Sequence, residues 1–136
     1  MPYYGAYMAA SFLANGTSIS ALDDGSSAYG GYATFSEAAT PIKILLYNSE
    51  YYDGGGNRTS QTFVLTGLTV DSVSAKRLTT SSATSTEETG DVSISGQNLA
   101  DATCNVEGAE VLESTSVIDG QASFEVASSE ALLIIL

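Results

Sequence analysis

The sequence predicts an all-β fold: an antiparallel β-sandwich of about eight strands with one α-helix at its N-terminus. Three observations support this prediction. The chain has 136 residues, a length that suits one domain with a buried core. Apolar residues with helical spacing are confined to residues 3–14. After Gly16, short apolar or alternating segments follow one another between turns rich in Gly, Asp and Asn.

The predicted helix spans residues 3–14. Its larger apolar residues recur at close to helical spacing, with alanines between them: Tyr3, Tyr4, Tyr7, Met8 and Phe12. Asn15 and Gly16 both tolerate the left-handed conformation that ends many helices. No charged residue precedes Asp23, so the helix is apolar nearly all round, whereas a surface helix normally has a polar face. This composition indicates a helix whose outer side meets a partner.

Strands are predicted next at residues 18–22, 29–35 and 42–47. The first ends at the turn sequence Asp23-Asp24-Gly25. The third is apolar on both faces apart from Lys43. Such a pattern is typical of a central strand that is covered on both sides.

Further strands are predicted along the second half of the chain, at 62–65, 70–78, 92–95 and 110–114. The clearest local signal is Asp119-Gly120, which favours a type I′ turn because both residues accept positive φ. It predicts a hairpin between 115–118 and 121–126. The apolar segment 131–136 predicts a buried final strand.

Charge and composition exclude several classes of function. Sixteen acidic against four basic residues give a net charge of −12, which argues against nucleic acid or an anionic membrane as partner. The chain has no His, which excludes a Ser-His-Asp triad and a zinc site built on His. Cys104 is the single cysteine, so an intrachain disulfide is excluded. No base is available to activate its thiol, so we expect this thiol to be buried or idle. We expect no cofactor. No run of apolar residues approaches the ~20 residues that a membrane-spanning helix needs.

Two features of the sequence disagree about localisation. The N-terminus, Met1-Pro2-Tyr3-Tyr4, lacks the positive flank of a signal peptide, so the chain taken as complete would be cytosolic. Asn15-Gly16-Thr17 and Asn57-Arg58-Thr59 match the N-glycosylation acceptor motif and indicate secretion. The conflict suggests that the natural N-terminus lies elsewhere.

Five groups of residues, in their order and spacing, resemble the C-terminal β-domain of family 79 glycoside hydrolases, the β-glucuronidases related to heparanase. They are Tyr3–Leu13 with Asn15-Gly16, Ile44–Asn48, Lys76–Thr79, Ser95–Gln97 and Ala127–Leu133. Together they extend over nearly the whole chain. The segment Lys-Arg-Leu-Thr and the terminal Ser-Glu-Ala-Leu-Leu are the most specific pair.

In that family a (β/α)8 barrel carries the chemistry and a β-sandwich packs beside it. The resemblance implies that residues 1–15 correspond to the last barrel helix and residues 16–136 to the sandwich. A barrel would then pack on the helix at four aromatic positions, Tyr3, Tyr4, Tyr7 and Phe12. The family's retaining mechanism uses two glutamates on barrel strands, and no position here matches either motif, so no catalytic residue is assigned. The implied parent is a secreted enzyme acting on β-glucuronide ends of polysaccharide or proteoglycan chains.

The sequence Tyr51-Tyr52-Asp53, before a run of three glycines, is a candidate carbohydrate contact. Aromatic faces can cover the apolar C–H side of a pyranose, and a nearby acid can hold its hydroxyls. The alternative is that the tyrosines pack on the sandwich or on the barrel, which is the commoner role of paired loop tyrosines.

Glycoside hydrolysis needs a pair of carboxylates, so the acidic pairs were considered as candidates. Glu110 and Glu113 are offset by three residues and would face opposite sides of a strand, so we expect solvated charges. Glu87-Glu88 lies in a polar loop, and we expect the same of it. Asp23-Asp24 lacks the spaced ligands of a calcium loop and is expected to form a turn.

Lys76 and Arg77 are half of the basic residues, and a cation could hold the carboxylate of a uronate. The alternative is an ion-pairing role inside an acidic protein, or a contact with the barrel.

Three functions are therefore considered: a non-catalytic domain that braces a barrel, a stand-alone carbohydrate-binding module that presents the tyrosine loop, and a structural or adhesive sandwich whose acidity gives solubility. If isolated, the chain is expected to self-associate through the aromatic residues of its helix.

Overall fold

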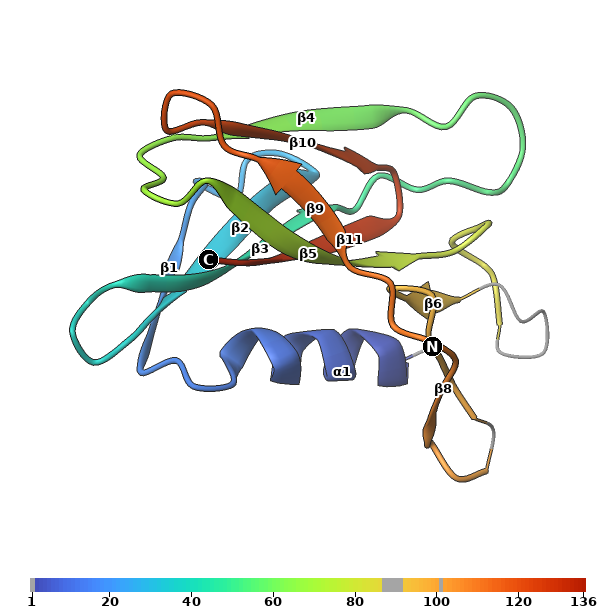
Figure 1. Cartoon of the computed structure of the whole chain (residues 1–136). Coiled ribbons are helices and arrows are strands. Elements are labelled where there is room, and N and C mark those ends of the chain that lie inside the picture. The colour runs from blue at the N-terminus through green and yellow to red at the C-terminus, as the bar shows by residue number, and fades with distance from the viewer. Residues whose placement is uncertain (1, 87–91, 101) are drawn as a thin grey trace.

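The computed structural model describes residues 2–86, 92–100 and 102–136. Helix α1 (Pro2–Leu13) precedes eleven strands in this part of the chain (Figure 1). The strands are β1 (Ser18–Ala21), β2 (Tyr29–Phe35), β3 (Pro41–Asn48), β4 (Ser60–Leu65), β5 (Ser72–Thr79), β6 (Ser93–Ile94), β7 (Asn98–Leu99), β8 (Val106–Glu107), β9 (Glu113–Ser116), β10 (Ala122–Ala127) and β11 (Glu130–Ile135). The predicted class, an antiparallel sandwich with an N-terminal helix, is confirmed. The strands outnumber the expected eight partly because β6, β7 and β8 have only two residues each.

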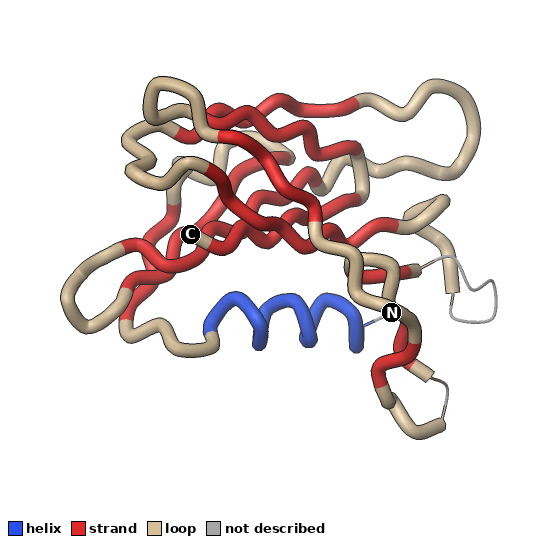
Figure 2. Tube along the Cα trace, viewed as in Figure 1, coloured by secondary structure: helices blue, strands red, loops and turns tan. Residues whose placement is uncertain are grey.

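The strands form one large antiparallel sheet and two small ones (Figure 2). The large sheet has the order β1-β2-β3-β11-β5-β6, and β9 also pairs with β5. Strand β3 lies between β2 and β11, as its apolar composition predicts for a central strand. Strands β4 and β10 pair with each other, and β7 pairs with β8.

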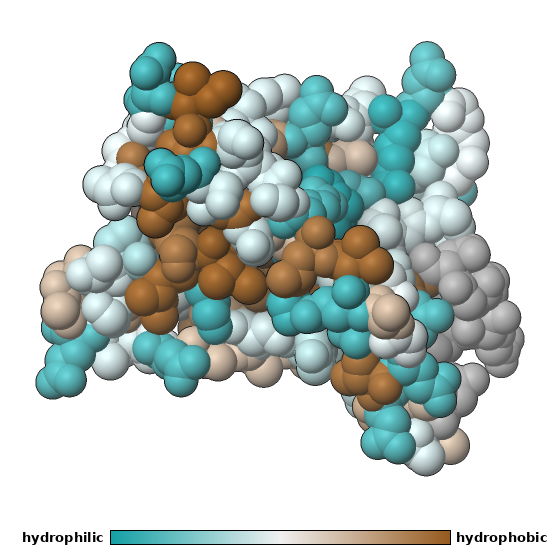
Figure 3. Space-filling view, viewed as in Figure 1, coloured by the Kyte–Doolittle hydropathy of each residue, from teal (hydrophilic) through white to brown (hydrophobic). Residues whose placement is uncertain are grey.

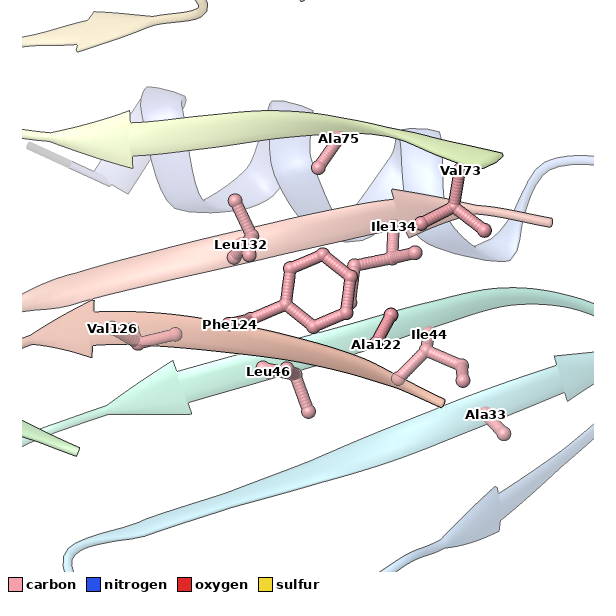
Figure 4. Packing of buried hydrophobic residues seen from close by; sticks show 10 residues of the cluster. All are labelled: Ala33, Ile44, Leu46, Val73, Ala75, Ala122, Phe124, Val126, Leu132 and Ile134. Carbon is pink, nitrogen blue, oxygen red and sulfur yellow. The ribbon is translucent and has the colours of Figure 1, made fainter. Parts of the chain in front are cut away.

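The first core layer lies between the large sheet and the β4–β10 pair. Alternate residues of β10 are buried, as the sequence predicts: Ala122, Phe124 and Val126. Figure 4 shows the Phe124 ring pointing among side chains of the large sheet, with Leu132 and Ile134 of β11 close to it. Both of these residues are fully buried, so β11 is the centre of this layer.

Helix α1 covers the opposite face of the large sheet and forms a second core layer (Figure 1). Tyr4, Met8 and Phe12 recur every four residues on one side of the helix, and each is 2–3% exposed. They pack with Ile94 and Leu133, which come from strands of the large sheet. The expectation that a barrel contacts Tyr4 and Phe12 is therefore wrong, because the helical period turns both side chains into this chain's own core.

Hydrogen bonds fix both ends of α1, one to the large sheet and the other to β7. The Lys43 ammonium of β3 donates to the carbonyls of Ser11 (2.5 Å) and Ala14 (2.8 Å), at a helix end whose carbonyls lack helical partners. Near the start of α1, the Tyr4 hydroxyl accepts a bond from the Leu99 amide (2.8 Å). Asn15 has φ 65°, so the left-handed helix end predicted there is confirmed.

The structure confirms the predicted turn at Asp119-Gly120 but not the long hairpin predicted around it. Both residues have positive φ, 52° and 74°, as a type I′ turn requires. Beyond a bridge between Ile118 and Gln121, the two segments separate. Strand β9 pairs with β5 in the large sheet, whereas β10 pairs with β4, so the expected long hairpin is wrong. A turn sequence fixes the local reversal, but the burial of each strand decides its partner.

We expect Lys43→Met to lower the free energy of unfolding by about 1.5–3 kcal/mol, because it removes two charge-assisted hydrogen bonds from the end of α1. Urea unfolding followed by circular dichroism measures the loss. Lys76→Met is the matched control. It breaks an ion pair with Glu110 that is partly open to solvent, so the expected loss is below about 1 kcal/mol. Equal losses in the two variants would show that Lys43 does not anchor the helix.

Candidate docking surface and tyrosine loop

The outer side of α1 is apolar and exposed. Its larger side chains are Tyr3, Tyr7 and Leu13, exposed to 56%, 37% and 52%. The exposed positions between them are small: Gly5, Ala6, Ala9 and Ala10. The helix therefore carries apolar residues on two sides, of which the sheet covers one. A helix on the surface of a soluble monomer normally shows polar residues on the outer side.

The surface continues from α1 onto the large sheet. Ile19 of β1 pairs with Thr34, whose hydroxyl donates to the Phe12 carbonyl, so Ile19 lies on the α1 side of the sheet. Tyr32 is two residues before Thr34 and shares that side. Its ring stacks on that of Tyr47 at 6.2 Å between centroids.

We call this set the helix-side surface: Tyr3, Tyr7, Leu13, Ile19, Tyr32 and Tyr47. The pKa of Tyr47 is raised, mainly by partial burial and to a smaller extent by Asp23 and Tyr32. Its hydroxyl is therefore neutral near pH 7. Sequence reasoning missed the two sheet tyrosines. The signal was available: period-two alternation puts Tyr32 opposite the core residue Ala33.

Another group of exposed apolar residues lies around β9 and the turns beside it rather than on α1. Its members are Val70, Val111, Leu112 and Ile118. Figure 3 shows apolar surface on the face that includes β5 and β9. All four residues lie in the connections on either side of β5 and β9 and are not members of the core cluster that includes α1.

The tyrosine loop does not present its three predicted residues together. Tyr51 is 70% exposed. Tyr52 is half-buried, with the Arg58 guanidinium 5.0 Å from its ring centroid, and its amide donates to the Ser129 hydroxyl (3.1 Å). The Asp53 carboxylate is exposed and accepts a bond from its own loop, at the Gly55 amide (2.9 Å). Tyr52 thus serves as an anchor, and Tyr51 alone offers an open aromatic side chain.

The position of this loop separates it from the helix-side surface. In Figure 1 the connection between β3 and β4 extends at the end of the molecule, on the side of β4 and away from α1. The Tyr52 carbonyl accepts a bond from the Ala83 amide (2.8 Å), which ties the base of the loop to the connection between β5 and β6. Tyr51 therefore lies on a loop whose base is braced against Ser129 and Ala83.

Arg77 lies in a cluster of charges at one end of the sheet. It donates two hydrogen bonds to the Glu113 carboxylate (2.6 and 2.9 Å) and one to Glu130 (2.9 Å). Bonding to Glu113 is the main cause that raises the pKa of Arg77. Arg58 adds an ion pair to Glu130 at 3.5 Å and donates to the carbonyl of Ser128. This cluster connects β5, β9 and β11.

All four basic side chains of the protein are held by acceptors of the same chain. Lys76 pairs with Glu110, and Arg77 pairs with Glu113. The pairing role considered for these two cations is the one the structure shows, and no uronate carboxylate is needed to balance them. The same pairs keep Glu110 and Glu113 on different cations, so the two carboxylates do not form a catalytic pair.

The other acidic candidates also have local roles. Asp23 accepts bonds from the amides of Gly25 and Gly31, and Asp24 accepts one from Ser26. Bonds from the Ser26 side chain and amide lower the pKa of Asp24. The predicted turn is confirmed. Within 2–86, 92–100 and 102–136, no three candidate ligand side chains come together for a metal ion.

The remaining candidates are placed as follows. Glu87-Glu88 lies outside the described residues. Cys104 is exposed rather than buried. The two sequon asparagines, Asn15 and Asn57, are both exposed. Among the described residues, α1 is too short to cross a membrane.

Comparisons with known proteins agree with this architecture. The family model described as the glycosyl hydrolase family 79 C-terminal beta domain matches residues 31–133. Among solved structures, the chain is similar to a 4-O-α-L-rhamnosyl-β-D-glucuronidase from Fusarium oxysporum 12S in complex with Rha-GlcA, with 44% identity and a TM-score of 0.94. The similarity covers 99% of this chain but only 29% of that chain. No curated protein matches.

The structural match includes α1 as well as the sandwich, because it covers 99% of the chain. The family match extends from β2 to β11. Both matches fit the resemblance seen in the sequence segments. On this evidence the chain belongs to glycoside hydrolase family 79, as its C-terminal β-domain.

Proposed function

We propose that this domain is non-catalytic and that it packs on and stabilises a catalytic (β/α)8 barrel through the helix-side surface. One observation carries the proposal: α1 has no charged residue, and only one of its two apolar sides is covered by its own sandwich. In this proposal α1 corresponds to the last barrel helix. Its inner side belongs to the sandwich, and its outer side belongs to the barrel.

The size of the related enzyme supports the proposal. This chain corresponds to 29% of the Fusarium glucuronidase, so most of an enzyme of that kind lies outside such a domain. Interfaces between domains of one chain commonly bury 600–1,500 Å². Burial of the surface that Tyr3, Tyr7 and Leu13 still expose, 37–56% for each residue, would contribute about 0.5–1.5 kcal/mol per side chain. Gly5 and the alanines leave room for a close approach by the barrel.

The same relationship supports a proposal for the parent enzyme. The proposed parent is a secreted retaining β-glucuronidase-type hydrolase that acts on β-glucuronide ends of polysaccharide or proteoglycan chains. In the described part of the chain, Glu113 and Glu130 do come together, but both are held by the Arg77 guanidinium, so neither is free to serve as nucleophile or general acid. We therefore expect the isolated chain to show no turnover of an aryl glucuronide.

A chimera tests the docking surface. The corresponding domain of the Fusarium enzyme is replaced by this chain, and the chimera is made with and without Tyr3→Asp and Tyr7→Asp. Two uncompensated carboxylates at a buried interface should destabilise the chimera by at least about 3 kcal/mol. The melting temperature should fall by at least about 3 °C, because an enzyme of several hundred residues shifts by roughly 1 °C per kcal/mol, and activity should be lost at lower temperature.

Two controls complete this experiment. Tyr51→Asp changes an exposed side chain that is not part of the helix-side surface, and it should leave the melting temperature of the chimera unchanged. In the isolated chain, Tyr3→Asp and Tyr7→Asp should leave stability within about 0.5 kcal/mol, because both side chains are exposed there. A chimera that tolerates both aspartates would contradict the proposed surface.

A second candidate role, binding of carbohydrate, is favoured by the 70% exposure of Tyr51 on a braced loop away from α1. An open aromatic ring can cover the C–H face of a pyranose. This role is compatible with docking, because it uses another part of the molecule.

Titration of the chain with glucuronide-containing oligosaccharides, followed by tyrosine fluorescence, tests this role. We expect saturable quenching that Tyr51→Ala abolishes and Tyr3→Ala retains. Replacing Tyr52 is avoided, because its ring packs against Arg58. Quenching that persists in Tyr51→Ala, or a flat response in the unmodified chain, would refute a sugar contact at this tyrosine.

A further inference from the structure

Asn57 belongs to a sequon that neither docking nor catalysis uses. Its side chain is exposed, and it has no hydrogen-bond partner among the residues that the structure describes. It follows three glycines in the connection between β3 and β4. This connection extends away from α1 in Figure 1.

The two residues after Asn57 are bound to the body of the domain. Arg58 donates to the carbonyls of Ser128 (2.7 and 2.9 Å) and Thr80 (2.9 Å). The Thr59 hydroxyl lies 2.7 Å from that of Ser128. The chain therefore turns inward directly after Asn57, while the asparagine itself stays in solvent.

The space before Asn57 is open. A methyl group added at Gly56 would meet no atom within 4 Å, and one at Gly55 would meet only the Asp53 carboxylate. Gly54 and Gly56 have positive φ, 92° and 72°, so the loop bends at both positions. A methyl group at Gly54 would meet the Ser82 side chain at 3.3 Å, so the open part of the loop begins at Gly55. A bulky group on Asn57 would displace no packed side chain of the described structure.

We infer that Asn57 is a site of N-linked glycosylation when the protein passes through a secretory pathway. The donor is an oligosaccharide linked to a lipid through pyrophosphate. The Asn57 Nδ2 forms a bond to the anomeric carbon of the first sugar, and the bond from that carbon to the pyrophosphate oxygen breaks. The lipid pyrophosphate leaves, and one Nδ2 proton passes to a base of the transferring enzyme.

Asn15 provides the matched comparison within the same chain. It is also exposed, but it follows Leu13 of the helix-side surface at the end of α1. A glycan there would lie beside the surface on which we propose that the barrel packs. The inference that Asn57 carries a glycan does not depend on the proposed docking of the barrel. The expectation that Asn15 carries no glycan does depend on it.

The experiment secretes the chimeric enzyme from a yeast and maps both sequons. Peptide N-glycosidase F in H₂¹⁸O converts each occupied asparagine to labelled aspartate, which peptide mass spectrometry locates. We expect label at Asn57, and loss of its glycan in Asn57→Gln but not in Asn15→Gln. The direct peptide map of the unmodified sequence gives the answer even if a variant is poorly secreted. The Asn57→Gln enzyme should melt at the same temperature as the deglycosylated parent.

The outcomes separate the two proposals. Unlabelled Asn57 in the secreted, active enzyme overturns the inference, and so does label at Asn15 alone. Label at both positions supports the site at Asn57 and counts against a barrel that packs beside Leu13.

Discussion

The large sheet is apolar on both of its faces, and the rest of the structure depends on how each face is covered. Leu132 and Ile134 of β11 face the β4–β10 pair, whereas Leu133 between them faces α1. A twelve-residue helix would be marginal alone in water. The sheet stabilises it by burying Tyr4, Met8 and Phe12, and by the Lys43 bonds at its end. Helix and sheet thus form one unit.

This arrangement decides what the domain has available for function. The basic side chains are committed to the fold, either at the end of α1 or in ion pairs such as Arg77–Glu130. Glu110 and Glu113 are bound to different cations, and Glu130 shares Arg77 with Glu113. What the domain leaves available is surface: an uncharged outer side of α1 continued by Tyr32, and one open tyrosine on a braced loop. A role in holding another domain suits such a molecule better than chemistry of its own.

Local features of this fold could be predicted from the sequence, and nonlocal ones could not. The helix, its end at Asn15 and the turn at Asp119-Gly120 follow from a few neighbouring residues, and the structure confirms them. The separation of β9 from β10 depends on burial across the sandwich, which no turn sequence contains. For the same reason the sequence placed Tyr4 and Phe12 against a missing barrel. It also grouped Tyr52 with Tyr51, although Arg58 and Ser129 hold Tyr52 in place.

The central claim is that another domain covers the outer side of α1. Hydroxyl-radical footprinting of the tyrosines tests it most directly, in the isolated chain and in the enzyme that carries it. The account predicts that Tyr3 and Tyr7 react readily in the isolated chain, diluted until it is monomeric, and become strongly protected in the enzyme, while Tyr51 reacts equally in both. Equal reactivity of Tyr3 and Tyr7 in the two samples would contradict it.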